Sequence, residues 1–256
     1  LYGAEHDNGM QDYINILTQY EEDENLNINL EVDDEVTVED YMSKLDSAYM
    51  VIIASHGMYG VAPGTWFSKY TEETPMISTN EIVNRDNRKK YKEQLDNHYV
   101  VMSESFANIG SRHYIVLPEL FEASYTENAL QGEMIYITAC EALGKYEADS
   151  GDKYDTSMVQ SLLDCGASSV LAYHNSVFKD YSFYMFDSIL ASLIDEKTLS
   201  VAVDKAKEIN GADQEEFARI NGELDDEYKK KNPEAYEMVL EGIGTNKAVI
   251  GVYGDE

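Results

Sequence analysis

Residues 49–57 read YMVIIASHG, and residues 134–141 read MIYITACE. Each stretch is a run of apolar, β-branched or aromatic residues, which is typical of a parallel strand buried on both faces. Each run ends at a residue that can do chemistry, His56 followed by Gly57 in the first and Cys140 in the second. Because ligands of open α/β sheets bind at the carboxyl ends of the strands, the two stretches predict a site at which His56 and Cys140 meet.

Helical and strand patterns alternate along the rest of the chain. Helical spacing or a helix-start signal marks five segments, residues 10–20, 38–45, 157–165, 178–194 and 199–209. Strand patterns mark three more, residues 26–32, 168–173 and 248–253. Strands that alternate with helices predict an α/β fold with a mostly parallel sheet and helices on both of its faces.

The chain shows no internal repeat and no linker, so residues 1–256 are predicted to form one domain. Residues 58–132 are less regular and are predicted to be an enlarged insertion, and residues 211–241 a polar helical excursion. Within the insertion a helix is predicted from Thr79 or Asn80 to about Leu95. It carries a basic cluster, namely Arg85, Arg88, Lys89, Lys90 and Lys92. The cluster is either a solvated helix face or a patch that binds a peptide or an anion.

The formal net charge of -30 is the outlier of the composition. It opposes binding to a nucleic-acid backbone or to an anionic membrane, because like charges repel. No apolar run approaches the roughly 18–20 residues of a membrane span, and no signal-peptide pattern is present. Since the sequence opens on Leu1 rather than Met, we expect a processed product or a part of a longer chain with further domains.

Signals for a metal or a cofactor are weak. The two cysteines cannot form a disulfide framework, and their spacing matches no zinc motif. The acidic, glycine-containing loop of residues 149–155 lacks the spacing of an EF-hand and its terminal glutamate. We therefore expect no cofactor, with calcium at this loop as the alternative.

The chemistry that fits the two strand ends is acyl transfer. The sequence holds no Gly-x-Ser-x-Gly elbow, no His-Glu-x-x-His motif and no phosphate-binding P-loop. Cys140 as a thiolate could attack a peptide carbonyl while His56 gives a proton to the leaving amine. The backbone N–H groups of Gly57 and Cys140 could form the oxyanion hole. Taken singly, however, a strand-end Cys or His is more often structural than catalytic.

The same residues resemble a known family. The strand that ends in SHG at residues 55–57, and the strand that ends in ACE at residues 139–141, are similar to the two signature blocks of caspase-like (clan CD) cysteine peptidases. This superfamily includes gingipains, clostripain, separase and bacterial CHAT domains. The block DCGASSV at residues 164–170 and the closing YGD at residues 253–255 are similar to those of gingipain-like and CHAT domains. The resemblance implies a caspase-like three-layer αβα sandwich.

The resemblance also implies roles for individual residues. His56 and Cys140 would be the catalytic dyad of an endopeptidase that needs no cofactor, and Gly57 would lie at the oxyanion hole. Residues that line the substrate pocket would follow the next strand, namely Tyr173, His174, Asn175 and Ser176. Thr138 stands where members that cut after Arg or Lys carry an acid, so the residue preference stays open. The substrate would be a polypeptide, and a secreted or cell-surface bacterial protein is favoured over a cytoplasmic one.

Two other functions remain open. The chain could keep the fold as a scaffold for interactions without catalysis, or it could use the same pair as a thiol acyltransferase or another thiol hydrolase. His6 and His174 could approach the same cleft, and Trp66 could cover it or anchor the insertion. Cys165, at a helix end that packs into the core, is predicted to be structural.

Overall fold

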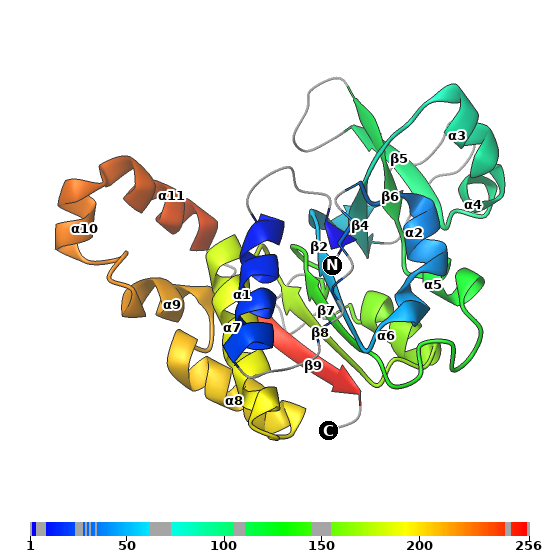
Figure 1. Cartoon of the computed structure of the whole chain (residues 1–256). Coiled ribbons are helices and arrows are strands. Elements are labelled where there is room, and N and C mark those ends of the chain that lie inside the picture. Colours follow the sequence, from blue (N-terminus) through cyan, green and yellow to red (C-terminus); the bar gives the residue numbers. More distant parts are fainter. Residues whose placement is uncertain are drawn as a thin grey trace.

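A computed structural model describes residues 2–3, 9–23, 28, 30, 32–33, 35–61, 73–104, 111–144, 155–243 and 247–254. Within these residues helices and strands alternate, and the strands form two sheets (Figure 1). We call the five-stranded sheet the central sheet and the four-stranded one the second sheet. The protein therefore belongs to the mixed α/β class.

The central sheet has the strand order β1-β2-β7-β8-β9. Its strands are β1 (Tyr2–Gly3), β2 (Met50–Ala54), β7 (Met134–Thr138), β8 (Ser169–His174) and β9 (Val249–Gly254). β1, β2, β7 and β8 pair in parallel, and β9 runs antiparallel to β8 at one edge. The prediction of a mostly parallel sheet, with its two central strands in the quoted stretches, is confirmed.

Helices cover both faces of the central sheet (Figure 1). Ile53 and Ile137 point into one hydrophobic cluster, whereas Ile52 and Tyr136 point into another. The first cluster is completed by α2 (Val38–Ser43), α5 (Glu119–Ser124) and α6 (Ser157–Asp164). The second is completed by α1 (Gly9–Asp23), α7 (Lys179–Ile194) and α8 (Leu199–Asn210). Because both faces are buried, the strands carry continuous apolar runs, as the sequence indicates.

The second sheet lies within the predicted insertion and is antiparallel, with the strand order β3-β4-β6-β5. Its strands are β3 (Gly57–Val61), β4 (Glu73–Ile82), β5 (Val100–Glu104) and β6 (Arg112–Val116). The short helices α3 (Arg85–Lys90) and α4 (Lys92–Asp96) follow β4. The sequence gives no clear signal for this sheet.

The predicted helix start at Thr79 or Asn80 is wrong, because the chain is still in β4 there. Thr79 is buried, and its hydroxyl donates to the carbonyl oxygen of Tyr114 in β6 at 3.0 Å. The helix begins at Arg85 instead, where the Asn84 side chain accepts from the N–H groups of Asp86 and Asn87. Asn80 and Asn84 are both plausible caps by sequence, and pairing with β6 decides between them.

Three other predicted segments are compared with the structure in turn: residues 38–45, 26–32 and 211–241. The helix predicted over residues 38–45 ends at Ser43 and is followed by a 3₁₀ turn, Leu45–Ser47. In the strand predicted over residues 26–32, the described Ile28, Leu30 and Val32 lie in irregular chain, and the other residues lie outside the described part. The excursion consists of α9 (Gln214–Ile220), α10 (Asp226–Lys231) and α11 (Pro233–Ile243), which extend away from the central sheet (Figure 1). None of the described helices is long and apolar enough to cross a membrane.

A core isoleucine should matter far more than an exposed one. Ile137 of β7 has no exposed surface, whereas the Ile220 side chain is 54% exposed. We expect Ile137→Ala to lower the free energy of unfolding by about 2–5 kcal/mol, because it leaves a cavity between the sheet and its helices. The matched change Ile220→Ala should cost less than about 1 kcal/mol. Urea unfolding followed by circular dichroism measures both, and equal losses would contradict the placement of β7.

Glu133, which precedes β7, should make stability depend on pH. Its side chain is 5% exposed and its Oε2 atom has no hydrogen-bond partner among the described residues. Burial, with the negative charge of Asp46, raises the pKa of Glu133 from 4.5 to about 7. Because the folded state holds this proton more tightly, stability falls as the pH rises from about 4.5 through 7.

The change Glu133→Gln should remove that dependence. We expect no difference in unfolding free energy near pH 4.5 and a gain of about 1–3 kcal/mol for the variant at pH 8. Urea unfolding across this pH range is the measurement. Glu127→Gln, at an exposed position, is the control and should change nothing. A Glu133→Gln gain that is the same at both pH values would contradict the assignment.

Candidate active site

β2 and β7 end side by side at one edge of the central sheet. The two strands pair in register from Met50 with Met134 to Ala54 with Thr138. His56 and Cys140 each lie two residues beyond this last pair, and both side chains are half-buried. The two candidate residues therefore occupy equivalent positions just beyond the ends of β2 and β7.

Gly57 brings the backbones of the two strand ends into contact. A Cβ atom added at Gly57 would overlap the carbonyl oxygen of Cys140 and would lie 3.0 Å from the Cβ atom of Ala139. It would also lie 3.1 Å from the backbone nitrogen of Cys140. Only a glycine fits this close approach. The chain after His56 thus runs directly against the chain that carries the cysteine.

Hydrogen bonds from β4 of the second sheet also hold the chain at His56. The carbonyl oxygen of His56 accepts from the N–H of Ser78 in β4 at 2.9 Å. The buried Ser55 hydroxyl donates to the carbonyl oxygen of Ser78 at 2.8 Å. β3 begins at Gly57, directly after the histidine. The predicted insertion therefore starts at the site itself and supports it.

Glu141 fixes the turn that follows Cys140, and sequence reasoning assigns it no role. Its backbone has a φ of 57°, in the left-handed region, and its N–H donates to the carbonyl oxygen of Asn175 at 2.7 Å. Its carboxylate accepts from the N–H of Tyr59 in β3 at 2.6 Å. Glu141 thus joins β7, β8 and β3. In the sequence, this role is indicated only by the position of Glu141 directly after Cys140. The residue type gives no hint, because glutamate does not favour a left-handed backbone.

The two cysteines occupy different environments. Cys140 is half-buried, and its Sγ atom lies 3.9 Å from the carbonyl oxygen of Val177, in the loop between β8 and α7. Cys165 is 2% exposed, and burial, with the charges of Glu122 and Asp164, raises the pKa of its thiol to about 11. A buried, protonated thiol is a poor nucleophile. The structure thus agrees with the prediction that Cys165 is structural.

The four residues expected to line the substrate pocket differ in their exposure to solvent. Tyr173 and His174 are buried, the first with its hydroxyl bound to Tyr136 and the second with Nδ1 2.8 Å from the carbonyl oxygen of Leu143. Asn175 is buried as well, with a φ of 60°. Only Ser176 exposes its side chain. The geometry therefore assigns Tyr173, His174 and Asn175 to the support of the site rather than to its surface.

Asn175 supports the site through hydrogen bonds of its backbone and of its side chain. Its N–H donates to the carbonyl oxygen of Gly144 at 3.1 Å, and its own carbonyl accepts from Glu141. Its Nδ2 atom donates to the carbonyl oxygen of Lys247 at 2.9 Å. The chain after β8 is thereby tied to the turn after Cys140. Thr138, two residues before the cysteine, donates its hydroxyl to Oγ of Ser182 in α7 at 2.8 Å and faces that helix.

Some expectations fall outside the described part of the chain. His6, Trp66 and most of the acidic loop of residues 149–155 lie there, and of that loop only Asp155 is described. Among the described residues, no group of three or more His, Cys, Asp or Glu side chains could hold a metal ion. Calcium at the loop therefore stays a prediction.

Comparison with known proteins gives no relative. No protein-family model, no curated protein and no solved structure matches the chain. The assignment of a function therefore depends on the residues and their geometry.

Gly57 offers a test of the contact between the two strand ends. We expect Gly57→Ala to lower the free energy of unfolding by about 1–3 kcal/mol, because the added methyl group overlaps the Cys140 backbone. Gly60→Ala in the same strand is the matched control. A Cβ there meets no atom within 4 Å, so it should change stability by less than about 1 kcal/mol. Thermal and urea unfolding measure both, and equal effects would refute the close approach.

Proposed function

We propose that the protein is a caspase-like cysteine endopeptidase that uses Cys140 as its nucleophile and His56 as its acid and base. One observation carries the proposal. β2 and β7 pair in register, each is followed after two residues by a candidate catalytic side chain, and Gly57 packs on the backbone of Cys140. A nucleophile and a base must reach the same substrate atoms, and strand ends on one edge of a sheet meet that need.

The proposed reaction proceeds through a covalent acyl-enzyme. The Cys140 thiolate attacks the carbonyl carbon of a peptide bond, and the N–H groups of Gly57 and Cys140 bind the oxygen that becomes negative. The His56 imidazolium gives its proton to the leaving amine. Neutral His56 then takes a proton from the water that attacks the thioester, and this step releases the acid and restores the Cys140 thiolate and the His56 imidazolium.

The fold around the pair supports the caspase-like part of the proposal. A mostly parallel sheet between two layers of helices is the architecture that the resemblance implies. The block at residues 164–170 forms the end of α6, a glycine turn and the start of β8. Gly166 there has a φ of 101°, and a Cβ atom would lie 2.6 Å from the Cα atom of Asn128. A glycine is thus required in this block as well.

The residues expected to line the pocket indicate no preference for Arg or Lys at the cleaved bond. Thr138 is bonded to Ser182, and Tyr173, His174, Asn175 and Ser176 include no carboxylate that would select Arg or Lys. The overall negative charge does not replace such a carboxylate, because exposed charges farther than about 8–10 Å are largely screened in physiological salt.

Loss of the cysteine should abolish cleavage. We expect Cys140→Ala to lower the cleavage of a mixed peptide library at least about a thousandfold, because no other group takes over the nucleophilic step. Cys165→Ala is the matched control and should retain most activity, since that thiol is buried. Mass spectrometry of the products gives the cleaved bonds. Activity that survives Cys140→Ala would overturn the proposal.

Thiol reactivity separates the proposal from its rivals. A nucleophilic Cys140 should react with iodoacetamide at pH 8 much faster than Cys165, whose pKa of about 11 leaves little thiolate. Equal, slow labelling and no cleavage would favour a non-catalytic interaction scaffold. Fast labelling with turnover of a thioester but not of peptides would favour an acyltransferase or another thiol hydrolase.

A further inference from the structure

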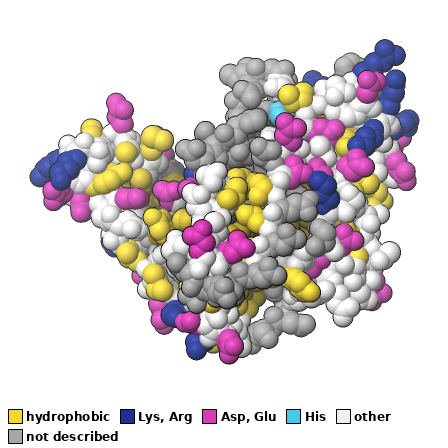
Figure 2. Space-filling view, in the orientation of Figure 1, with side chains coloured by type: hydrophobic (Ala, Val, Ile, Leu, Met, Phe, Trp, Pro, Cys, Tyr) yellow, Lys and Arg dark blue, Asp and Glu magenta, His cyan; other side chains and the backbone are white. Residues whose placement is uncertain are grey.

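Five cations line one pocket in a chain that has few of them. The sequence holds 19 Lys and Arg against 49 Asp and Glu. The pocket at one end of the second sheet is nevertheless lined by Arg85, Arg88, Lys89, Lys92 and Arg112. In Figure 2, dark blue side chains gather over the same part of the molecule, where Figure 1 places α3 and α4.

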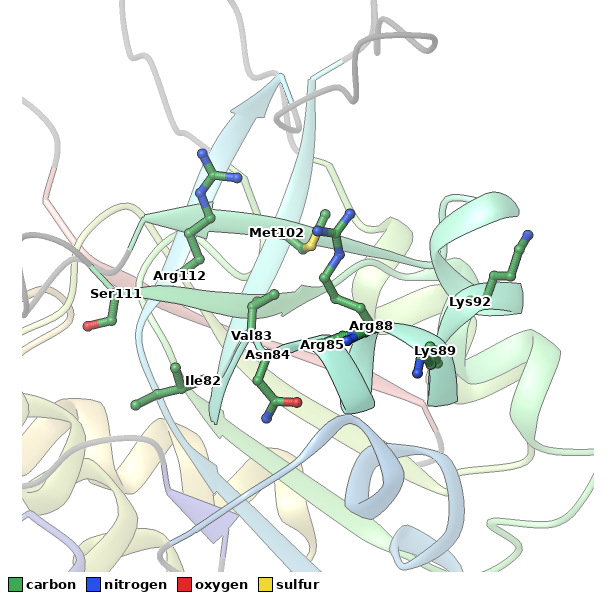
Figure 3. A pocket seen from close by; sticks show the side chains of 10 residues that line it. All are labelled: Ile82, Val83, Asn84, Arg85, Arg88, Lys89, Lys92, Met102, Ser111 and Arg112. Atoms are coloured by element: carbon green, nitrogen blue, oxygen red, sulfur yellow. The ribbon is translucent and has the colours of Figure 1, made fainter.

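The pocket combines this basic rim with an apolar wall. Its volume is about 770 Å³, and its apolar side chains are the half-buried Val83 and Met102 together with Ile82, which is 55% exposed. In Figure 3, Met102 lies between the guanidinium groups of Arg88 and Arg112. The N–H of Val83 donates to the carbonyl oxygen of Arg112 at 2.7 Å, which fixes the end of β4 to the start of β6.

The three arginines of this pocket differ from its two lysines in their ion pairing. Within the part of the chain that the structure describes, Arg85, Arg88 and Arg112 form no ion pair. Lys89 and Lys92 pair with Asp86 and Asp96 on their own helices, and all four side chains are exposed. Exposed pairs of this kind are weak and readily exchange for another anion.

We propose that this pocket, which we call the basic pocket, binds an acidic polypeptide segment that also carries an apolar side chain. Carboxylates of the segment pair with the guanidinium groups, whose planar forks suit them. Its apolar side chain packs on Val83 and Met102. Pockets of roughly 300–1,000 Å³ accept ligands with several groups, so the basic pocket has room for more than one side chain.

The arrangement of the cations favours a peptide over a compact phosphate. Arg85 and Arg88 come from α3, Lys92 from α4 and Arg112 from β6, on different sides of the apolar wall. A single phosphate would draw its cations around one point and would leave the apolar wall uncovered. A peptide can place carboxylates at several points and an apolar side chain between them.

The charge of the whole protein does not prevent this binding. At physiological ionic strength the Debye length is about 8 Å, so the local cations dominate over distant acids. The lining of the basic pocket does not include the candidate dyad. Ser78, which binds the His56 carbonyl, and Ile82 at the pocket are four residues apart in β4, a span of at most about 13 Å. The inference therefore stands apart from the proposed peptidase activity.

Fluorescence anisotropy with a labelled acidic peptide tests the inference. The peptide has about ten residues, mostly Asp and Glu with two Leu, and its counterparts replace the acids by Lys or the Leu by Ser. We expect only the first to bind tightly, with an affinity that falls as salt is raised. The triple variant Arg85→Gln, Arg88→Gln and Arg112→Gln should weaken binding at least about tenfold.

A charge-matched variant controls for the loss of three positive charges. Lys205→Gln, Lys229→Gln and Lys230→Gln change exposed lysines outside the pocket and should weaken binding less than about twofold. Thermal unfolding shows that both triple variants are folded. Equal weakening by the two variants, or no binding of the acidic peptide, would overturn the inference.

Two further arms decide the kind of ligand and its independence from catalysis. Tripolyphosphate that displaces the peptide, together with equal binding of the peptides with Leu and with Ser, would overturn the peptide ligand in favour of a phosphate. All measurements are repeated in the Cys140→Ala protein. The Cys140→Ala protein should bind the acidic peptide as tightly as the unchanged protein does. A failed test of the peptidase therefore leaves the binding result intact, and a failed binding test leaves the peptidase result intact.

Discussion

The in-register pairing of β2 with β7 is the constraint on which the rest of the structure depends. It places Ile53 and Ile137 in one hydrophobic cluster and Ile52 and Tyr136 in the other. A slip of one residue would turn every side chain of a strand to the opposite face, and with both faces buried neither cluster would accept it. The same slip would move Cys140 about 3.3 Å along the sheet relative to His56. Core packing and site geometry are therefore set by one pairing.

The face of the sheet toward α7 is held by hydroxyl groups as well as by apolar packing. The Tyr136 hydroxyl donates to the carbonyl oxygen of Ser182 at 2.7 Å, and Thr138 donates to the hydroxyl of the same serine. Burial raises the pKa of Tyr136 and of Tyr173 well above the usual value, so both phenols stay neutral. These directional bonds orient α7, and the chain that leads into α7 carries the Val177 carbonyl near Cys140. Part of the site's geometry is thus fixed from within the core.

The sequence predicts the central sheet well, because strands buried on both faces are continuous apolar runs. It does not reveal the second sheet. β3 contains two glycines, and β4 mixes Pro75 with polar residues, so neither has a clear pattern of period two. β3 pairs with β4, and β4 pairs with β6, so the sheet depends on contacts between residues distant in sequence. The burial of Asn175 is equally hidden, since it follows from a left-handed backbone at this residue and from bonds to the turn after Cys140.

Some lysines of this acidic chain join segments of the fold through ion pairs, in contrast to the arginines of the basic pocket. Lys44 lies between Asp33 and Asp40, at 2.9 and 2.8 Å, and its pKa is raised because both carboxylates accept from it. Lys247 likewise pairs with Glu215 and Asp213. These lysines join segments of the fold and reduce its self-repulsion locally. Arg85, Arg88 and Arg112 form no ion pair within the described residues, although the chain has acids in excess. These three guanidinium groups are exposed, form no ion pair within the described residues and lie beside an apolar wall, and this combination is the physical reason to regard the pocket as a place for a ligand.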